Sequence, residues 1–85
     1  MPQGFDRHEF ARRLAVIRRY RGFSQERLAK AAGVSPSTIA LYELARSNPN
    51  ASTLTTLCDT LGCSLDVILG RVPLTIGEDD AEGEG

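Results

Sequence analysis

The sequence predicts an all-α fold, a compact bundle of five short helices followed by a short C-terminal arm. Apolar residues recur at spacings of three and four along most of the chain, which is typical of helices with one buried face. A residue able to cap a helix precedes each apolar segment, and a glycine ends most of them. With 85 residues, the chain is long enough for one domain with a compact, locally connected core.

The central stretch, residues 24–43, contains two short helices that meet at a glycine. Ser24 can cap the first helix, and Gly33 can take the left-handed conformation that ends it. Ser35 can then cap a second helix, with Pro36 at its first position, where the missing amide hydrogen matters least. Because the connection is so short, the helices cannot lie antiparallel and must cross steeply, which is a helix-turn-helix.

Three further helices flank this pair. The first is expected to be capped by Asp6, with Glu9 completing a capping box, and to run to about Arg21. Asn50 is expected to cap a helix that ends at Gly62, and Ser64 caps the last one. The residues expected to face the core are Phe10, Leu14, Ile17, Leu28, Ala31, Ala32, Leu54, Leu57, Cys58, Leu61, Leu65, Ile68 and Leu69. Arg12, Arg13 and Arg19 are expected to face solvent or phosphate.

The net charge of −1 conceals an uneven distribution. Residues 78–85 hold five acids, and we expect this tail to be disordered because it has too little apolar surface to fold. Residues 1–77 contain ten Lys and Arg against six acids, so the folded part is basic. A basic domain is typical of proteins that bind nucleic acids. The tail either competes for the basic surface or aids solubility.

These residues also carry a resemblance to a known family. The pattern resembles the phage-repressor type of helix-turn-helix, the Cro-like or XRE family, and covers about residues 10–69. The matching residues are Ser24, Gln25, Leu28, Ala29, Gly33, Val34, Ser35, Ile39, Tyr42, Glu43, Asn48, Pro49, Leu54, Leu57 and the segment 61–65. The resemblance implies a lambda-repressor-like fold that binds double-stranded DNA.

In this family the helix at residues 36–44 lies in the major groove. The resemblance implies that Val34, Ile39 and Tyr42 point inward, and that the candidate base readers are Pro36, Ser37, Thr38, Ala40 and Leu41. Polar readers are common where this chain has alanine and leucine. Direct reading of bases must therefore depend on the two hydroxyls and on contact with thymine methyl groups, or specificity comes from DNA shape.

The resemblance also assigns scaffold and backbone-contact roles. Ser24, Gln25 and Arg46 are the candidate phosphate contacts, and Arg18 is expected to form a buried ion pair with Glu43. Ala45 stands where the family often has a left-handed glycine. If the turn is kept, the alanine costs about 1–2 kcal/mol, and the alternative is that residues 46–50 follow another path.

Apolar residues near the C-terminus suggest a partner, since family members usually bind two-fold related half-sites as dimers. We divide the chain into a DNA-binding domain at residues 1–70, an arm at 71–77 that can contact a second copy, and the tail. The candidate dimer contacts are Leu65, Val67, Ile68, Val72, Leu74 and Ile76. The alternative is that the arm folds back on its own domain.

Several classes of protein are excluded. Cys58 and Cys63 are not spaced like a zinc or redox pair and are interpreted as small buried hydrophobes, while His8 lies far from both. We therefore expect no metal, no cofactor and no enzyme activity. The sequence has no apolar run of about 20 residues and no signal segment, so a cytoplasmic protein without membrane contact is expected.

The sequence thus predicts a sequence-specific DNA-binding transcriptional regulator, a repressor that binds a palindromic or pseudopalindromic operator as a homodimer. Two alternatives remain open at this point. One is an antitoxin or restriction-controller protein of the same fold. The other is a protein-interaction module that uses Ala40, Leu41 and Leu44 on the outward face of the third helix.

Overall fold

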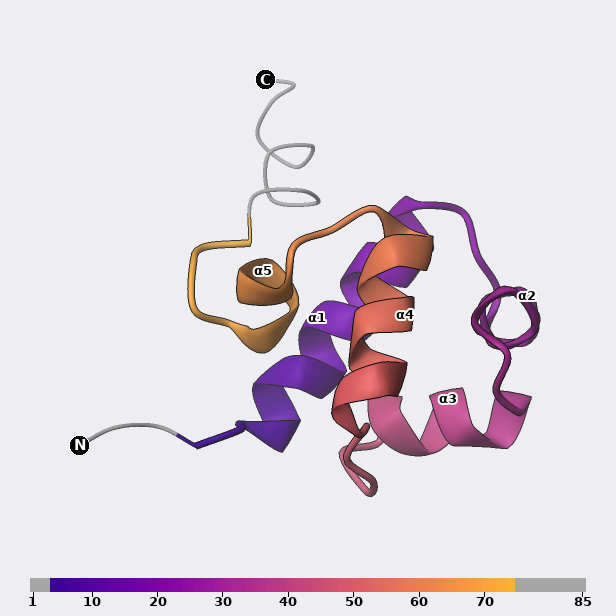
Figure 1. The fold of residues 1–85 in the computed structure, drawn as a ribbon, viewed down its shortest axis with the longest axis horizontal. Coiled ribbons are helices and arrows are strands. Elements are labelled where there is room, and N and C mark those ends of the chain that lie inside the picture. Colours follow the sequence, from indigo (N-terminus) through magenta and orange to yellow (C-terminus); the bar gives the residue numbers. More distant parts are fainter. Residues whose placement is uncertain (1–3, 75–85) are drawn as a thin grey trace.

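The computed structural model describes residues 4–74 of the chain, and these residues fold into five helices without a strand. The all-α prediction is confirmed (Figure 1). The helices are α1 (Arg7–Tyr20), α2 (Gln25–Ala32), α3 (Pro36–Glu43), α4 (Ala51–Leu61) and α5 (Leu65–Leu69). Among residues 4–74, every helix is too short or too polar to pass through a lipid bilayer. Ile76 and the acidic tail lie outside the described residues.

Each helix begins at the cap that the sequence predicts. Asp6 accepts hydrogen bonds from the amides of His8 and Glu9, and the other four helices each have a side-chain oxygen that accepts from the amide three residues further on. These bonds satisfy amides that the helix itself leaves without acceptors. The expected capping box differs in its second half, because the carboxylate of Glu9 instead accepts from Arg12 and from Arg13.

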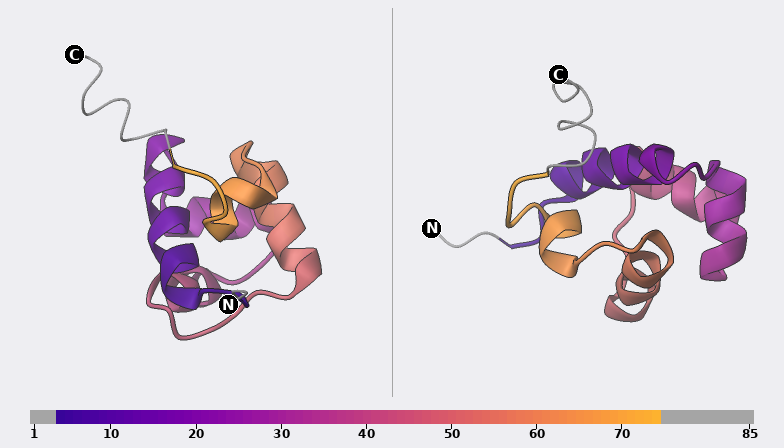
Figure 2. Two further views of the ribbon diagram at one scale, coloured as in Figure 1. Left: turned by 90° about the vertical axis from the view of Figure 1, so that its left-hand side faces the viewer. Right: turned by 90° about the horizontal axis from the view of Figure 1, so that it is seen from above.

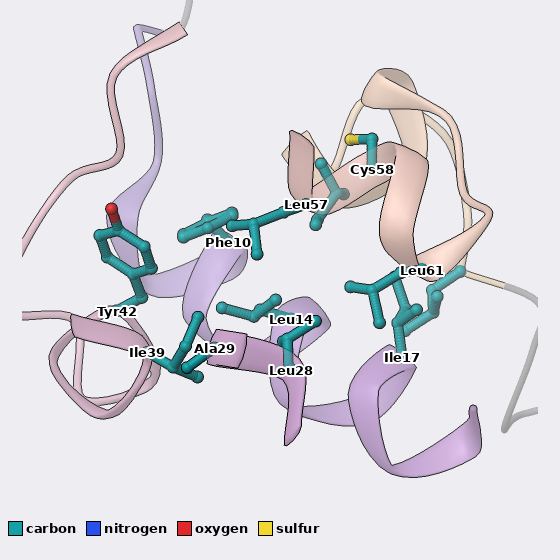
Figure 3. Close-up of a cluster of buried hydrophobic side chains, with 12 residues drawn as sticks. Phe10, Leu14, Ile17, Leu28, Ala29, Ile39, Tyr42, Leu57, Cys58 and Leu61 are labelled. Carbon is teal, nitrogen blue, oxygen red and sulfur yellow. The ribbon is translucent and has the colours of Figure 1, made fainter. Parts of the chain in front are cut away.

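The helices surround one apolar core. In Figure 1, α4 crosses in front of α1, but both views of Figure 2 place these two helices on opposite sides of the molecule. Buried side chains of the helices converge between them (Figure 3). The buried apolar residues are Phe10, Ala11, Leu14, Ile17, Leu28, Ala29, Ile39, Tyr42, Leu57, Cys58, Leu61, Ile68 and Leu74. The core prediction needs correction at Ala31 and Leu65, which are exposed.

Arg13 is the clearest departure from the sequence prediction. It was expected to face solvent or phosphate, yet only 7% of its surface is exposed. Its Nη1 donates to the carbonyl oxygens of Val67 at 2.8 Å and Val72 at 2.6 Å, and its Nε donates to Glu9 at 2.6 Å. The last carbonyls of a helix have no donor within it. The guanidinium supplies donors at the end of α5 and in the segment that follows.

Of the arm predicted at residues 71–77, the structure describes residues 71–74, and this part packs onto the domain through Leu74. Leu74 is only 2% exposed and belongs to the core cluster, as does Ile68. Ile68 and Leu74 are therefore removed from the candidate dimer contacts, because their side chains are already buried within one chain. Leu65 and Val72 are exposed, and Val67 is partly buried against the core.

Cys58 lies in the last turn of α4 and Cys63 lies just after the helix, and both pack as small apolar residues do. Cys58 is buried and Cys63 is partly buried, and both thiols are free. Burial raises the pKa of Cys58 to about 12 and also raises the pKa of Cys63, since an apolar environment disfavours the thiolate.

We expect Arg13→Ala to lower the free energy of unfolding by about 2–4 kcal/mol, because it removes the Arg13 donor from the Val72 carbonyl and one of the two donors from the Val67 carbonyl. Arg12→Ala is the matched control. Arg12 is also bonded to Glu9, but it lies on the surface, so its loss should cost less than about 1 kcal/mol. Urea denaturation measures both values, and equal losses for the two variants would contradict this role for Arg13.

Glu9 gives the domain a pH dependence. Hydrogen bonds from Arg12 and then Arg13 lower the pKa of Glu9 to about 2, from an ordinary value of 4.5. The folded state thus favours the carboxylate, and the stabilisation is complete above pH 4.5 and lost as the pH falls through about 2. In thermal unfolding, the difference between wild type and Glu9→Gln should be constant from pH 5 to 7 and shrink at lower pH. A difference that stays constant down to pH 2 would exclude this mechanism.

Candidate nucleic-acid interface

The connection between α2 and α3 forces the two helices to cross steeply. Gly33 has a φ of +76°, and the amide of Val34 donates to the carbonyl of Ala29 at 2.9 Å, which closes a helix end of the Schellman type. α3 begins three residues later at Pro36. Figure 1 views α2 end-on while α3 lies across the page, so the two axes are far from parallel. This is the helix-turn-helix that the sequence predicts.

A buried ion pair fixes α3 against α1. Arg18 Nε lies 2.6 Å from one carboxylate oxygen of Glu43, and Nη2 lies 3.0 Å from the other. The two side chains are only 9% and 8% exposed. Such a two-point pairing fixes orientation as well as distance. The ion pair predicted for Arg18 and Glu43 is therefore present.

The same pair also reaches the start of α2. Arg18 Nη1 donates to the carbonyl of Phe23 at 2.8 Å, and the side-chain amide of Gln25 donates to Glu43 at 3.0 Å. Three elements thus share one polar network, which we call the Arg18 network. It consists of Arg18, Glu43, Gln25 and the Phe23 carbonyl.

Gln25 is a candidate phosphate contact with part of its donor capacity already used. One N–H of its side-chain amide is committed to Glu43, which leaves the second N–H for a ligand. Ser24 accepts from the amide of Arg27 as the helix cap. The amides of Gln25 and Glu26 begin α2 and have no acceptor within it. A helix start with such amides attracts a phosphate group.

The outward surface of α3 offers few polar groups. Pro36, Ser37 and Leu41 are exposed, whereas Thr38 and Ala40 are partly buried. Leu44, which ends the helix, is 63% exposed. The predicted base readers thus differ in exposure, with three of them in solvent and two partly covered by the domain.

The hydroxyl groups at the start of α3 bond to each other, which the sequence reasoning missed. Ser35 Oγ lies 3.1 Å from Ser37 Oγ and 2.9 Å from Thr38 Oγ1, and it also accepts from the amide of Thr38. A capping serine followed by two further hydroxyl residues within three positions was the available signal. The cluster limits how freely the two candidate readers can turn toward a base.

The turn after α3 keeps the left-handed geometry expected in the resemblance, although it contains alanine. Ala45 has a φ of +59°, and the amide of Arg46 donates to the carbonyl of Leu41 at 2.9 Å. The alternative path for residues 46–50 is therefore not taken at this turn. Arg46 is exposed at the end of the turn that follows α3, where a phosphate contact was predicted.

The fold and this geometry define a helix-turn-helix domain. A family model described as Helix-turn-helix matches residues 14–68, which is more than half of the chain. The chain belongs to this family, in its XRE type. The family is one of DNA-binding regulators and is not an enzyme family.

One curated relative is named as a transcriptional regulator and another as a repressor. The chain is 37% identical over 60 residues to an SPbeta prophage-derived HTH-type transcriptional regulator of Bacillus subtilis, covering 71% of this chain and 56% of the relative. It is 39% identical over 70 residues to the immunity repressor protein of Bacillus phage phi105, covering 82% of this chain and 48% of that protein. The chain thus spans about half the length of these relatives.

A solved structure supports the fold. The crystal structure of the clp gene regulator ClgR from C. glutamicum matches with a TM-score of 0.69 at 28% identity. The match covers 80% of this chain and 94% of the other. The similarity therefore extends over nearly the whole of that regulator chain.

We expect Ala45→Gly to raise the free energy of unfolding by about 0.5–1 kcal/mol. The left-handed conformation costs a non-glycine residue about 1–2 kcal/mol, and the greater freedom of unfolded glycine offsets about half of that gain. The control is Ala31→Gly, on the exposed side of α2, which should instead lose about 1 kcal/mol. Thermal unfolding separates the two, and a decrease for both variants would show that Ala45 is unstrained.

We expect Glu43→Ala to cost about 3–5 kcal/mol of stability, because Arg18 then remains buried without an opposite charge and keeps only the Phe23 carbonyl as an acceptor. Replacing both residues by apolar ones, as in Arg18→Met with Glu43→Leu, should recover most of that loss. Chemical denaturation of the single and double variants gives the comparison. If the double variant were no more stable than Glu43→Ala, a stranded charge would not be the cause of the loss.

Proposed function

We propose that this protein is a sequence-specific DNA-binding transcriptional regulator that represses its targets by occupying a palindromic or pseudopalindromic operator. The observation that carries the proposal is the Arg18 network, which holds α3 steeply across α2 with its outward side in solvent. The names of the relatives, a prophage regulator and an immunity repressor, support it. The protein would act in the cytoplasm, where DNA is accessible, without a cofactor.

In this proposal α3 enters the major groove and α2 lies across the backbone, as in other helix-turn-helix proteins. Ser24, Gln25 and Arg46 contact phosphates and fix the register of the domain on the duplex. Pro36, Ser37, Thr38, Ala40 and Leu41 face the bases.

The protein would bind as a homodimer, since a palindromic operator matches a two-fold protein. Leu65 and Val72 are exposed apolar side chains at the two ends of the α5 segment, and Val67 is partly buried beside them. The same surface on a second copy would cover them. Deleting the residues after α5 cannot test the dimer, because the deletion also removes Leu74 from the core. Leu65→Asp should instead convert a dimer to a monomer in sedimentation, and a monomeric wild type would contradict the proposal.

A second function has one observation in its favour. Leu41 is 42% exposed and Leu44 is 63% exposed, and apolar side chains on one side of a helix are also suited to a protein partner. In that case α3 would not read DNA. The experiment below separates the two functions.

The test is selection of binding sites from random duplex DNA with the purified protein. We expect an enriched palindrome whose half-sites lie about one helical turn, roughly 10 base pairs, apart. Failure to enrich a motif, with affinity lost by about 0.2 M salt as for binding to phosphates alone, would contradict the proposal. Ser37→Asp should abolish binding by placing a charge against the bases. Thr55→Asp adds the same charge on the exposed side of α4 and should bind nearly as well as wild type.

A further inference from the structure

The outward side of α3 is apolar where DNA-reading helices usually carry amides or cations. The helix contains one charged residue, Glu43, and its carboxylate is bonded to Arg18 and Gln25 on the inner side. Leu41 is 42% exposed and Ala40 is partly buried beside it. The base-facing side therefore offers methyl groups and the hydroxyls of Ser37 and Thr38, and it carries no charge.

We propose that Leu41 selects thymine by packing against the C5 methyl group of the base in the major groove, with Ala40 completing the contact. The inference rests on the proposed function, because it requires that α3 lie in the groove. It goes further by naming the residue that determines specificity and the chemical group that it recognises.

The hydrogen-bonding capacity of α3 leads to this assignment. Two-point recognition of guanine or adenine needs a guanidinium or a side-chain amide, and α3 contains neither. The hydroxyls of Ser37 and Thr38 already bond to Ser35 Oγ. The major-groove feature that an apolar side chain can recognise is the thymine methyl group.

The charges near the outward side of α3 and the small apolar area of that side favour DNA over a protein as its partner. The outward side carries no acid to repel phosphates, and the exposed Arg46 lies in the turn that follows α3. A stable protein interface buries about 800 Å² on each partner. Leu41 and Leu44 are the exposed large apolar residues of this helix, and two leucines supply only a small part of that area.

The experiment uses the operator recovered by selection and replaces each thymine in turn with deoxyuridine, which removes only the C5 methyl group. For wild type we expect about a fourfold loss of affinity at one or two symmetry-related positions, as burial of one methyl-sized group implies. Leu41→Ala should bind thymine and deoxyuridine equally at those positions. Tyr20→Ala, which removes an exposed side chain from the end of α1, should keep the full discrimination.

The possible failures are distinguishable. If no operator is enriched, the proposed function fails and this inference fails with it. If an operator is found but no thymine responds to deoxyuridine, or if Leu41→Ala keeps the discrimination, the inference is overturned and the proposed function stands. If Leu41→Asp binds the operator as wild type does, the face does not touch DNA and is assigned to a protein partner. Circular dichroism melting establishes that each variant is folded before binding is measured.

Discussion

The position of α3 depends on one interaction, the buried pairing of Arg18 with Glu43. Taking two charges out of water is costly unless their remaining donors and acceptors are also satisfied. Here the Phe23 carbonyl and the Gln25 amide complete the network, and residues 4–74 contain no buried side-chain nitrogen or oxygen without a partner. Because α1, α3 and the start of α2 meet in this network, the outward side of α3 and the free amides of α2 face solvent in a fixed relation.

Two further arginines, one in α1 and one at its C-terminal end, also hold other helices by donating to their terminal carbonyl groups. Arg13 donates to carbonyls at the end of α5 and beyond it, and Arg21 donates to the Leu61 carbonyl at the end of α4 at 2.8 Å. A five-residue helix such as α5 is unstable alone. Its place in the fold comes from Arg13 and from the buried Ile68. The C-terminal part of the domain thus depends on α1 as much as the helix-turn-helix does.

Local signals in the sequence predict much of this structure. The caps at Ser24 and Ser35, the left-handed Gly33 and the spacing of apolar residues all depend on near neighbours, and each is found as expected. Arg13 could not be placed in this way, because its burial depends on carbonyls more than 50 residues away. Leu74 was misplaced for a similar reason, since the short apolar sequence around Pro73 does not reveal which surface covers it. The ion pair was predicted only through resemblance to a family.

The site combines a rigid support with a reading surface that has little hydrogen-bonding capacity. In the function proposed above, such a domain would gain affinity from phosphates and select sequence by methyl contact and DNA shape. The most direct measurement is an amide chemical-shift map of the ¹⁵N-labelled protein titrated with its selected duplex. The largest shifts should fall on Gln25 and Glu26 at the start of α2 and on residues 37–41 of α3. Largest shifts on α4, with residues 37–41 unchanged, would contradict the entry of α3 into the groove.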